Sequence, residues 1–148
     1  MGKGRFVDVD GIRTSYFEGE SGEPMVLVHG GYFGSTVSAN CWRPIFDHLA
    51  SQFHVDVVDK PGQGYTDHPN CDARYSMEAV IQHLYRFMKT LGLQNVHLAL
   101  TPFGISLYNI ISGVVDRTQL HVFNHYGHYS FQECPGEVTE QMVSFFKG

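Results

Sequence analysis

The segment Met25-Val26-Leu27-Val28-His29-Gly30-Gly31 carries the strongest signal of the fold class of this chain. A short continuous apolar run that leads directly into glycines is typical of a strand buried on both faces and ending in a loop. Further along, Asn40–Gln52 carries apolar residues at helical spacing, and Phe53–Val58 is a second apolar run that ends at Asp59. Strand, helix and strand in this order predict a parallel βαβ unit.

The remaining segments add elements of the same α/β type. Towards the N-terminus, Arg5–Val9 and Ile12–Phe17 alternate around Asp10-Gly11, a dipeptide that favours a tight hairpin turn. Towards the C-terminus, the patterns predict a helix over Ser76–Leu91 with Gly92 as its C-cap, a strand over Val96–Leu100, a helix over Ile105–Ile111, a strand over Gln119–Phe123 and a helix over Val138–Phe146. We therefore expect an α/β fold whose mostly parallel sheet has helices on both faces and an N-terminal β-hairpin.

Composition narrows the class of protein. Of the 148 residues, 43% are hydrophobic and 17% are charged, which excludes a disordered chain and fits one domain over residues 1–148. The net charge is -5 and the basic residues are not clustered, so the chain lacks the basic patch that is typical of nucleic-acid-binding proteins. No apolar run is long enough to span a membrane, and the irregularly spaced cysteines indicate reduced thiols, so a cytoplasmic location is expected.

Several motifs resemble a known enzyme family. They are the opening hairpin, the run Gly22–Gly31, Asn40 with Trp42 and Arg43, the turn Asp59–Thr66 and the helix start Tyr75-Ser76-Met77. Together they resemble the first half of an α/β-hydrolase, and within that superfamily the meta-cleavage-product hydrolases, which split carbon–carbon bonds in ring-opened aromatics. The segment Leu120–Phe146 resembles the end of the same fold. The resemblance implies a truncated α/β-hydrolase-like three-layer sandwich.

The middle of the chain departs from this family pattern. The strand Val96–Leu100 should lead into a Gly-x-Ser-x-Gly nucleophile elbow, but the sequence continues Thr101-Pro102-Phe103-Gly104, with proline at the serine position. The pattern also lacks the family's cap domain and the strand that bears its catalytic acid. We therefore expect a single compact domain without a cap.

The matched motifs supply the candidate catalytic residues. The resemblance implies that His128, directly after Gly127, is the catalytic histidine and acts as general base. The segment His29-Gly30-Gly31 has the form of an oxyanion loop, because Gly30 and Gly31 let backbone N–H groups point at a developing negative charge, and Asn40 is assigned to substrate binding. The structural alternatives are a surface-loop histidine at position 128 and a turn at Gly31 that simply needs a positive φ.

Carboxyl and hydroxyl groups near the same edge of the sheet complete the candidate set. Asp59 ends a parallel strand, where it can orient His128 or cap the Asp-x-x-Gly-x-Gly corner as a structural residue. Ser35 lies just beyond the glycine loop and is the candidate nucleophile. Thr101 and Ser106 are predicted near the same face, but no motif supports them, and turn or cap roles are the alternative for all three hydroxyls.

No metal site and no cofactor are expected. His125 and His128 have a His-x-x-His spacing, but a catalytic zinc usually needs three protein ligands, and no further metal-binding motif stands beside this pair. The pair Gly62 and Gly64 is too short for a dinucleotide fingerprint, which needs a third glycine and a helix directly after it.

Functions of two different classes fit these patterns. The first is a weak hydrolase of small activated esters or related acyl and meta-cleavage-type substrates, with His128 activating water or Ser35 acting as nucleophile. The second is a non-catalytic binding or scaffold protein that kept the α/β-hydrolase fold. In both cases the missing elements predict an exposed strand edge, and therefore a homodimer formed with or without exchange of Ile105–Gly148 between protomers.

Overall fold

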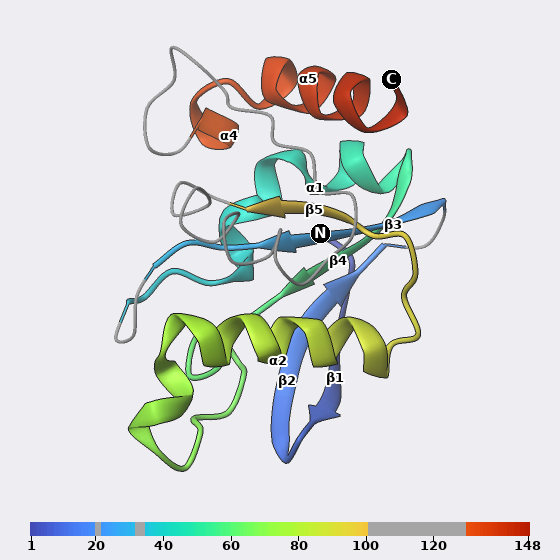
Figure 1. The fold of residues 1–148 in the computed structure, drawn as a ribbon. Helices are drawn as coiled ribbons and strands as arrows, with labels where there is room; N and C mark the ends of the chain where they lie inside the picture. The colour runs from blue at the N-terminus through green and yellow to red at the C-terminus, as the bar shows by residue number, and fades with distance from the viewer. Residues whose placement is uncertain (20–21, 32–34, 101–129) are drawn as a thin grey trace.

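A twisted sheet forms the centre of the protein, whose computed structural model describes residues 1–19, 22–31, 35–100 and 130–148 (Figure 1). Within these residues the sheet has five strands in the order β1-β2-β4-β3-β5. Their bounds are β1 (Lys3–Val9), β2 (Ile12–Glu18), β3 (Glu23–Val28), β4 (Phe53–Val58) and β5 (His97–Leu100). The predicted α/β class with a mostly parallel central sheet is confirmed.

The N-terminal hairpin forms as predicted. Asp10 has φ 52° and Gly11 has φ 78°, so both turn residues adopt the left-handed conformation that a two-residue hairpin loop requires. The Asp8 carboxylate accepts a hydrogen bond of 3.1 Å from the Gly11 N–H and closes the turn. Strand β2 then continues into the main sheet by pairing antiparallel with β4.

The parallel part of the sheet also follows the prediction. Strand β3 pairs in parallel with β4 on one side and with β5 on the other, which confirms the βαβ unit and the third parallel strand. Strand β4 has the predicted bounds, and β5 begins one residue later than predicted. Parallel pairing brings the carboxyl ends of β3, β4 and β5 to one edge of the sheet.

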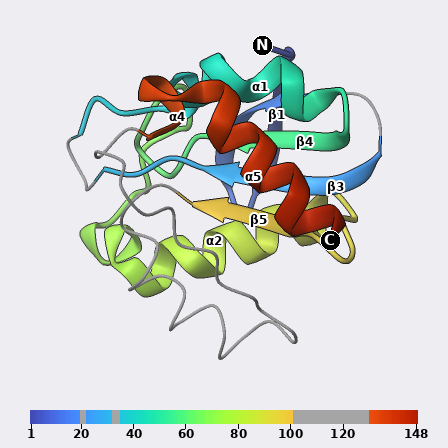
Figure 2. The ribbon, with the colours of Figure 1, turned by 90° about the horizontal axis from the view of Figure 1, so that it is seen from above.

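Helices cover both faces of the sheet, as Figures 1 and 2 show. Helix α2 (Met77–Thr90) lies on one face, preceded by the 3-10 helix η2 (Asp72–Tyr75). Its N-cap is Ser76, whose hydroxyl accepts a hydrogen bond from the Ala79 N–H. On the other face lie α1 (Arg43–Ala50), α4 (Ser130–Glu133) and α5 (Pro135–Lys147).

The helix predicted over Asn40–Gln52 differs from the structure, because it is divided in two. A 3-10 helix, η1 (Ala39–Trp42), precedes α1 (Arg43–Ala50). Pro44 lies in the first turn of α1, where its missing N–H costs no hydrogen bond and its fixed φ suits a helix start. Hydrophobic periodicity continues through both pieces, so it does not reveal the boundary.

Each face of the sheet has its own apolar core. On the side of α1 and α5, the indole of Trp42 stacks on the ring of Phe131 with centroids 4.8 Å apart. The side chains buried on that side are Met25, Leu27, Ala39, Trp42, Ile45, Phe46, Leu49, Phe53, Val55, Val57, Phe131, Val138 and Met142. On the α2 side, Phe87 packs edge-on against Tyr16 with centroids 5.3 Å apart. The alternate side chains of β3 and β4 therefore pack into different cores.

The predicted helix Ile105–Ile111 and strand Gln119–Phe123 lie outside the described residues. Among the helices that the structure describes, none is long and apolar enough to cross a membrane. In the described sheet β1 and β5 are the outer strands. The expected homodimer stays a prediction.

Candidate active site

The candidate site lies at the carboxyl ends of the parallel strands. His29, Gly30 and Gly31 follow β3, and Asp59 and Lys60 follow β4. These two loops meet because their strands are neighbours with matched ends, Val28 opposite Val58. Figure 2 shows β3 and β5 side by side on this sheet. In α/β sheets this edge is where ligands bind.

The imidazole of His29 ties the two loops together. Its side chain is buried, and its Nε2 accepts a hydrogen bond of 3.2 Å from the Lys60 backbone N–H. Since Nε2 is an acceptor, Nδ1 carries the proton, and it lies 2.8 Å from the Gly30 carbonyl oxygen, to which it donates. Burial, with a smaller effect of Lys60, lowers the pKa of His29 to about 4. The ring is therefore neutral at neutral pH, and its two hydrogen bonds fix the loop after β3 against the loop after β4.

Gly31 has the backbone conformation expected of the oxyanion loop. Its φ is 85°, in the left-handed region that favours glycine. The Lys60 ammonium donates a hydrogen bond of 2.6 Å to the Gly31 carbonyl oxygen. Burial lowers the pKa of Lys60 to about 8, so this lysine is still mainly charged at neutral pH. The Lys60 ammonium and the His29 ring thus connect the loop after β3 to the loop after β4.

Ser35 lies directly against Gly31. A Cβ added to Gly31 would lie 2.5 Å from the Ser35 hydroxyl oxygen. That hydroxyl accepts a hydrogen bond of 3.1 Å from the Val37 N–H, which leaves its proton available to another acceptor. The structure therefore brings the candidate nucleophile and the candidate oxyanion glycine together.

Asp59 is fully engaged by its own corner. One carboxylate oxygen accepts a hydrogen bond of 2.7 Å from the Ala39 N–H, and the other accepts one of 3.1 Å from the Tyr65 N–H. A Cβ at Gly64 would lie 2.2 Å from the Asp59 carboxylate, so only glycine fits there. These contacts are those of the corner-capping alternative. Orientation of His128 by Asp59 stays a prediction.

A family model described as alpha/beta hydrolase fold matches residues 23–100, from the start of β3 to the end of β5. The chain belongs to the α/β-hydrolase fold family. In this α/β-hydrolase the matched residues include the loop with Gly31 and the corner at Asp59, so the described half of the candidate site is made of family segments.

Two of the relatives are hydrolases of 2-hydroxy-6-oxo dienoic acids. The chain is 37% identical over 88 residues to a 2-hydroxy-6-oxo-6-(2'-aminophenyl)hexa-2,4-dienoic acid hydrolase of Metapseudomonas resinovorans, a match that covers 60% of this chain and 29% of that enzyme. It is 36% identical over 104 residues to a 2-hydroxy-6-oxo-2,4-heptadienoate hydrolase of Pseudomonas putida, covering 70% of this chain and 37% of that one. The resemblance to meta-cleavage-product hydrolases is therefore confirmed.

A solved structure supports the same placement. The fold is similar to that of a serine hydrolase involved in carbazole degradation, with a TM-score of 0.64 and 29% identity, covering 76% of this chain and 43% of that chain. In all three comparisons the chain spans less than half of the relative's length, from 29% to 43%.

The other candidate residues are placed as follows. Asn40 lies exposed in η1, next to Ala39, whose N–H is bound by Asp59. His128, Thr101 and Ser106 lie outside the described residues. The structure thus brings Gly31, Ser35 and Asp59 to one edge of the sheet.

The contacts that the side chains of His29 and Lys60 make between the two loops were not predicted from the sequence. These contacts join residues far apart in the sequence. The His29 ring binds the backbone of Lys60, 31 positions later, and the Lys60 ammonium binds the carbonyl of Gly31, 29 positions earlier. One sequence signal was available: both residues directly follow an apolar strand, the position where α/β proteins place functional groups.

Acidification is expected to destabilise the fold through His29. The folded pKa is about 4, below the ordinary value of 6.5, so the unfolded chain takes up this proton first as the pH falls. Stability from this residue is therefore complete above pH 6.5 and is lost as the pH falls towards 4. Between about pH 7 and about pH 4.5 the loss amounts to about 2 kcal/mol. Urea unfolding at the two pH values should show a loss that is smaller by this amount in His29→Asn than in the parent.

His48→Asn is the matched control, because His48 is exposed on α1. Its pH dependence should equal that of the parent. Burial also lowers the pKa of His83 to about 4, so a further part of the loss should remain in every one of these variants. An unchanged pH dependence in His29→Asn would show that His29 is not a buried neutral base.

Proposed function

We propose that this α/β-hydrolase is a hydrolase of small activated esters or related acyl and meta-cleavage-type substrates. The observation that carries the proposal is Gly31, a left-handed glycine at the carboxyl end of β3 with the Ser35 hydroxyl beside it. In a glycine loop that is fixed by hydrogen bonds, backbone N–H groups can bind a developing oxyanion. The substrate class is supported by the names of the relatives, which are hydrolases of hydroxy-oxo dienoic acids.

In the proposed mechanism His128 is the general base. It removes a proton from the attacking oxygen and returns it to the leaving group as the tetrahedral intermediate collapses. The attacking oxygen belongs either to water or to Ser35, and in the second case an acyl-enzyme is then hydrolysed by water. The Gly30-Gly31 loop binds the oxyanion in both cases, and exposed Asn40 is assigned to substrate binding.

The proposed rate is low because the sequence lacks the nucleophile elbow. In the family the strand corresponding to β5 leads into a Gly-x-Ser-x-Gly turn that presents a preorganised serine. Here proline takes that position, at Pro102. Ser35 follows a glycine loop instead, so its attack lacks the alignment that such a turn supplies.

A fluorophosphonate probe tests the catalytic proposal against a scaffold role. With a Ser35 nucleophile, the probe should label one peptide containing Ser35, and Ser35→Ala should abolish that labelling. With water as the attacking group, labelling should be absent while p-nitrophenyl acetate is still hydrolysed above the buffer rate. Absence of both labelling and hydrolysis would overturn the proposal in favour of a non-catalytic α/β-hydrolase-derived binding protein.

Gly31→Val should reduce ester turnover roughly a hundredfold, because a side chain there obstructs the approach of the substrate oxygen to the loop. The substitution should also lower stability, though by a smaller factor than turnover. A Cβ at Gly31 would approach the Ser35 hydroxyl to 2.5 Å, at a φ of 85°. The backbone strain adds a stability cost of about 1–2 kcal/mol. Turnover should be measured with p-nitrophenyl acetate under conditions where urea unfolding shows the variant to be folded.

Gly11→Val is the matched control for this substitution. Gly11 also has a positive φ, 78°, but it lies in the hairpin turn with nothing within 4 Å of an added Cβ. It should lose comparable stability from backbone strain and keep parent turnover. Equal turnover in Gly31→Val and Gly11→Val would show that the loop after β3 is a structural turn without a role in catalysis.

A further inference from the structure

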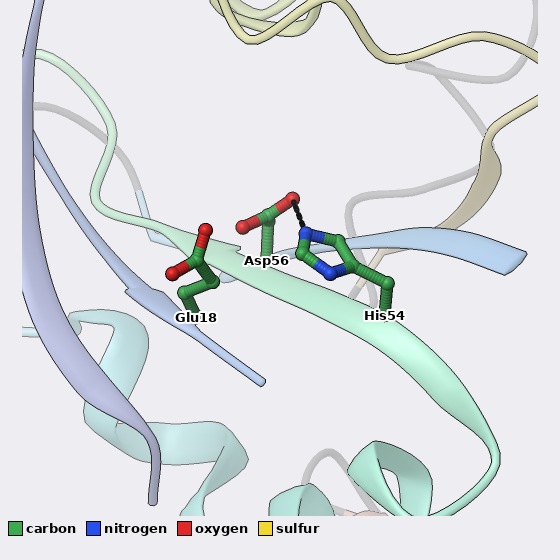
Figure 3. A group of neighbouring side chains, drawn as sticks. All are labelled: Glu18, His54 and Asp56. Carbon is green, nitrogen blue, oxygen red and sulfur yellow. Dashed lines mark ion pairs between the residues drawn. The ribbon is translucent and has the colours of Figure 1, made fainter. Parts of the chain in front are cut away.

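A group of metal-binding side chains lies away from the candidate active site. It consists of Glu18 at the end of β2 and of His54 and Asp56 in β4. Glu18 is the cross-strand partner of Asp56 in the antiparallel pair, and His54 is two residues before Asp56, so all three side chains share one face of the sheet. Figure 3 shows the three side chains turned towards one another. One ligand atom from each lies within 4.8 Å of the others.

The Asp56 carboxylate is buried beside the His54 ring. Its side chain is 0% exposed, and neither of its oxygens accepts a hydrogen bond from the residues that the structure describes. Its partner is the His54 ring, whose Nε2 lies 3.4 Å from one oxygen. Burial is the main cause that raises the pKa of Asp56 to about 6. A buried carboxylate is costly unless charge or hydrogen bonds compensate it, and a cation would supply that compensation.

The neighbouring charges leave room for a cation. The side chains of Glu18 and His54 are 23% and 28% exposed, which provides a route from solvent to the buried carboxylate. Arg5 pairs with one oxygen of Glu18 through its Nε, so the other oxygen remains for a ligand bond. Tyr16 is a further titratable group close to the site, and burial together with the charges of Glu18 and Asp56 raises the pKa of its phenol. The carboxylates of Glu18 and Asp56 supply negative charge for a cation, and Arg5 compensates part of the charge on Glu18.

The donor set favours a transition metal over calcium or magnesium. One imidazole nitrogen with two carboxylate oxygens suits Zn²⁺, whereas Ca²⁺ and Mg²⁺ are bound by oxygen ligands alone. Ligand atoms around a tetrahedral Zn²⁺ lie roughly 3.4 Å apart, given bonds of about 2.1 Å. Binding therefore requires the partly exposed Glu18 and His54 side chains to rotate inward, while the buried Asp56 stays in place.

We propose that Glu18, His54 and Asp56 bind one divalent transition cation of the Zn²⁺ type, with water as the remaining ligand. The ion links β2 to β4 and so fastens the N-terminal hairpin to the parallel part of the sheet. The site lies in the amino-terminal part of β4, whereas Asp59 and Lys60 of the candidate active site follow its carboxyl end. Its role is structural and is independent of the proposed hydrolysis.

Zinc titration of the chelator-treated protein tests the proposal. Isothermal calorimetry should show one Zn²⁺ per chain, and Tm should rise with zinc concentration. Asp56→Asn and His54→Gln should each weaken zinc affinity roughly tenfold or more and remove the rise in Tm. Co²⁺ in place of Zn²⁺ should give visible absorption bands in the parent that both variants lose.

His97→Gln is the matched control. His97 forms a comparable pair with the Glu23 carboxylate, 3.1 Å away, on the adjacent strands β5 and β3. This variant should bind zinc like the parent. If zinc causes no rise in Tm in the parent, or if His54→Gln and His97→Gln bind zinc equally, the proposal is overturned. His54 is partly exposed, so its variant decides the matter even if Asp56→Asn fails to fold.

Discussion

Asp59→Ala is expected to lower the free energy of unfolding by about 3–5 kcal/mol. The carboxylate is 1% exposed and accepts hydrogen bonds from the Ala39 and Tyr65 N–H groups. Alanine removes both acceptors at once and leaves two donors without partners in the corner. The corner also places Gly64 against the carboxylate, so the turn would lose the group around which it is folded. Urea unfolding at neutral pH measures the effect.

Asp47→Ala is the control for this substitution, because the Asp47 side chain is 82% exposed in α1. It should change stability by well under 1 kcal/mol. Asp59→Ala also decides between the roles considered for this residue. Unchanged stability with lost turnover would show that Asp59 orients His128, whereas a large loss of stability with residual turnover supports corner capping.

His128→Ala is expected to reduce ester turnover by a factor on the order of 10² to 10⁴ while the protein remains folded. A general base contributes this much because it accepts the proton as the new bond forms. The effect should be the same for a water or a Ser35 nucleophile, since the proposed mechanism uses His128 in both. The measurement is p-nitrophenyl acetate hydrolysis, with circular dichroism to verify the fold.

His125→Ala is the matched control, three positions earlier in the sequence. It removes a histidine from the same segment without touching the residue that resembles the catalytic one. Its turnover should match that of the parent. Equal turnover in His128→Ala and the parent would remove His128 from the mechanism and support a scaffold function.

The order of local elements was predictable because each follows from nearby residues. Alternation around Asp10-Gly11 predicts the hairpin, and the apolar runs Met25–Val28 and Phe53–Val58 predict buried parallel strands. Ser76 and Gly92 mark the ends of α2. The family pattern added Gly31 and Asp59 as residues of the sheet edge, where the structure has them. The division between η1 and α1 was not predicted, because hydrophobic spacing continues across it.

Local sequence patterns were sufficient to predict the five described strands, the helices α1, α2 and α5 and the glycine loop, since turn chemistry and hydrophobic period act over a few residues. Which side chains meet depends on the tertiary structure. The Lys60 ammonium reaches Gly31, and Glu18 meets His54 and Asp56, because β4 is placed between β2 and β3 in one particular register. A shift of that register by one residue would turn Asp56 to the opposite face. Contacts of this kind depend on strand order and alignment, which no local pattern specifies.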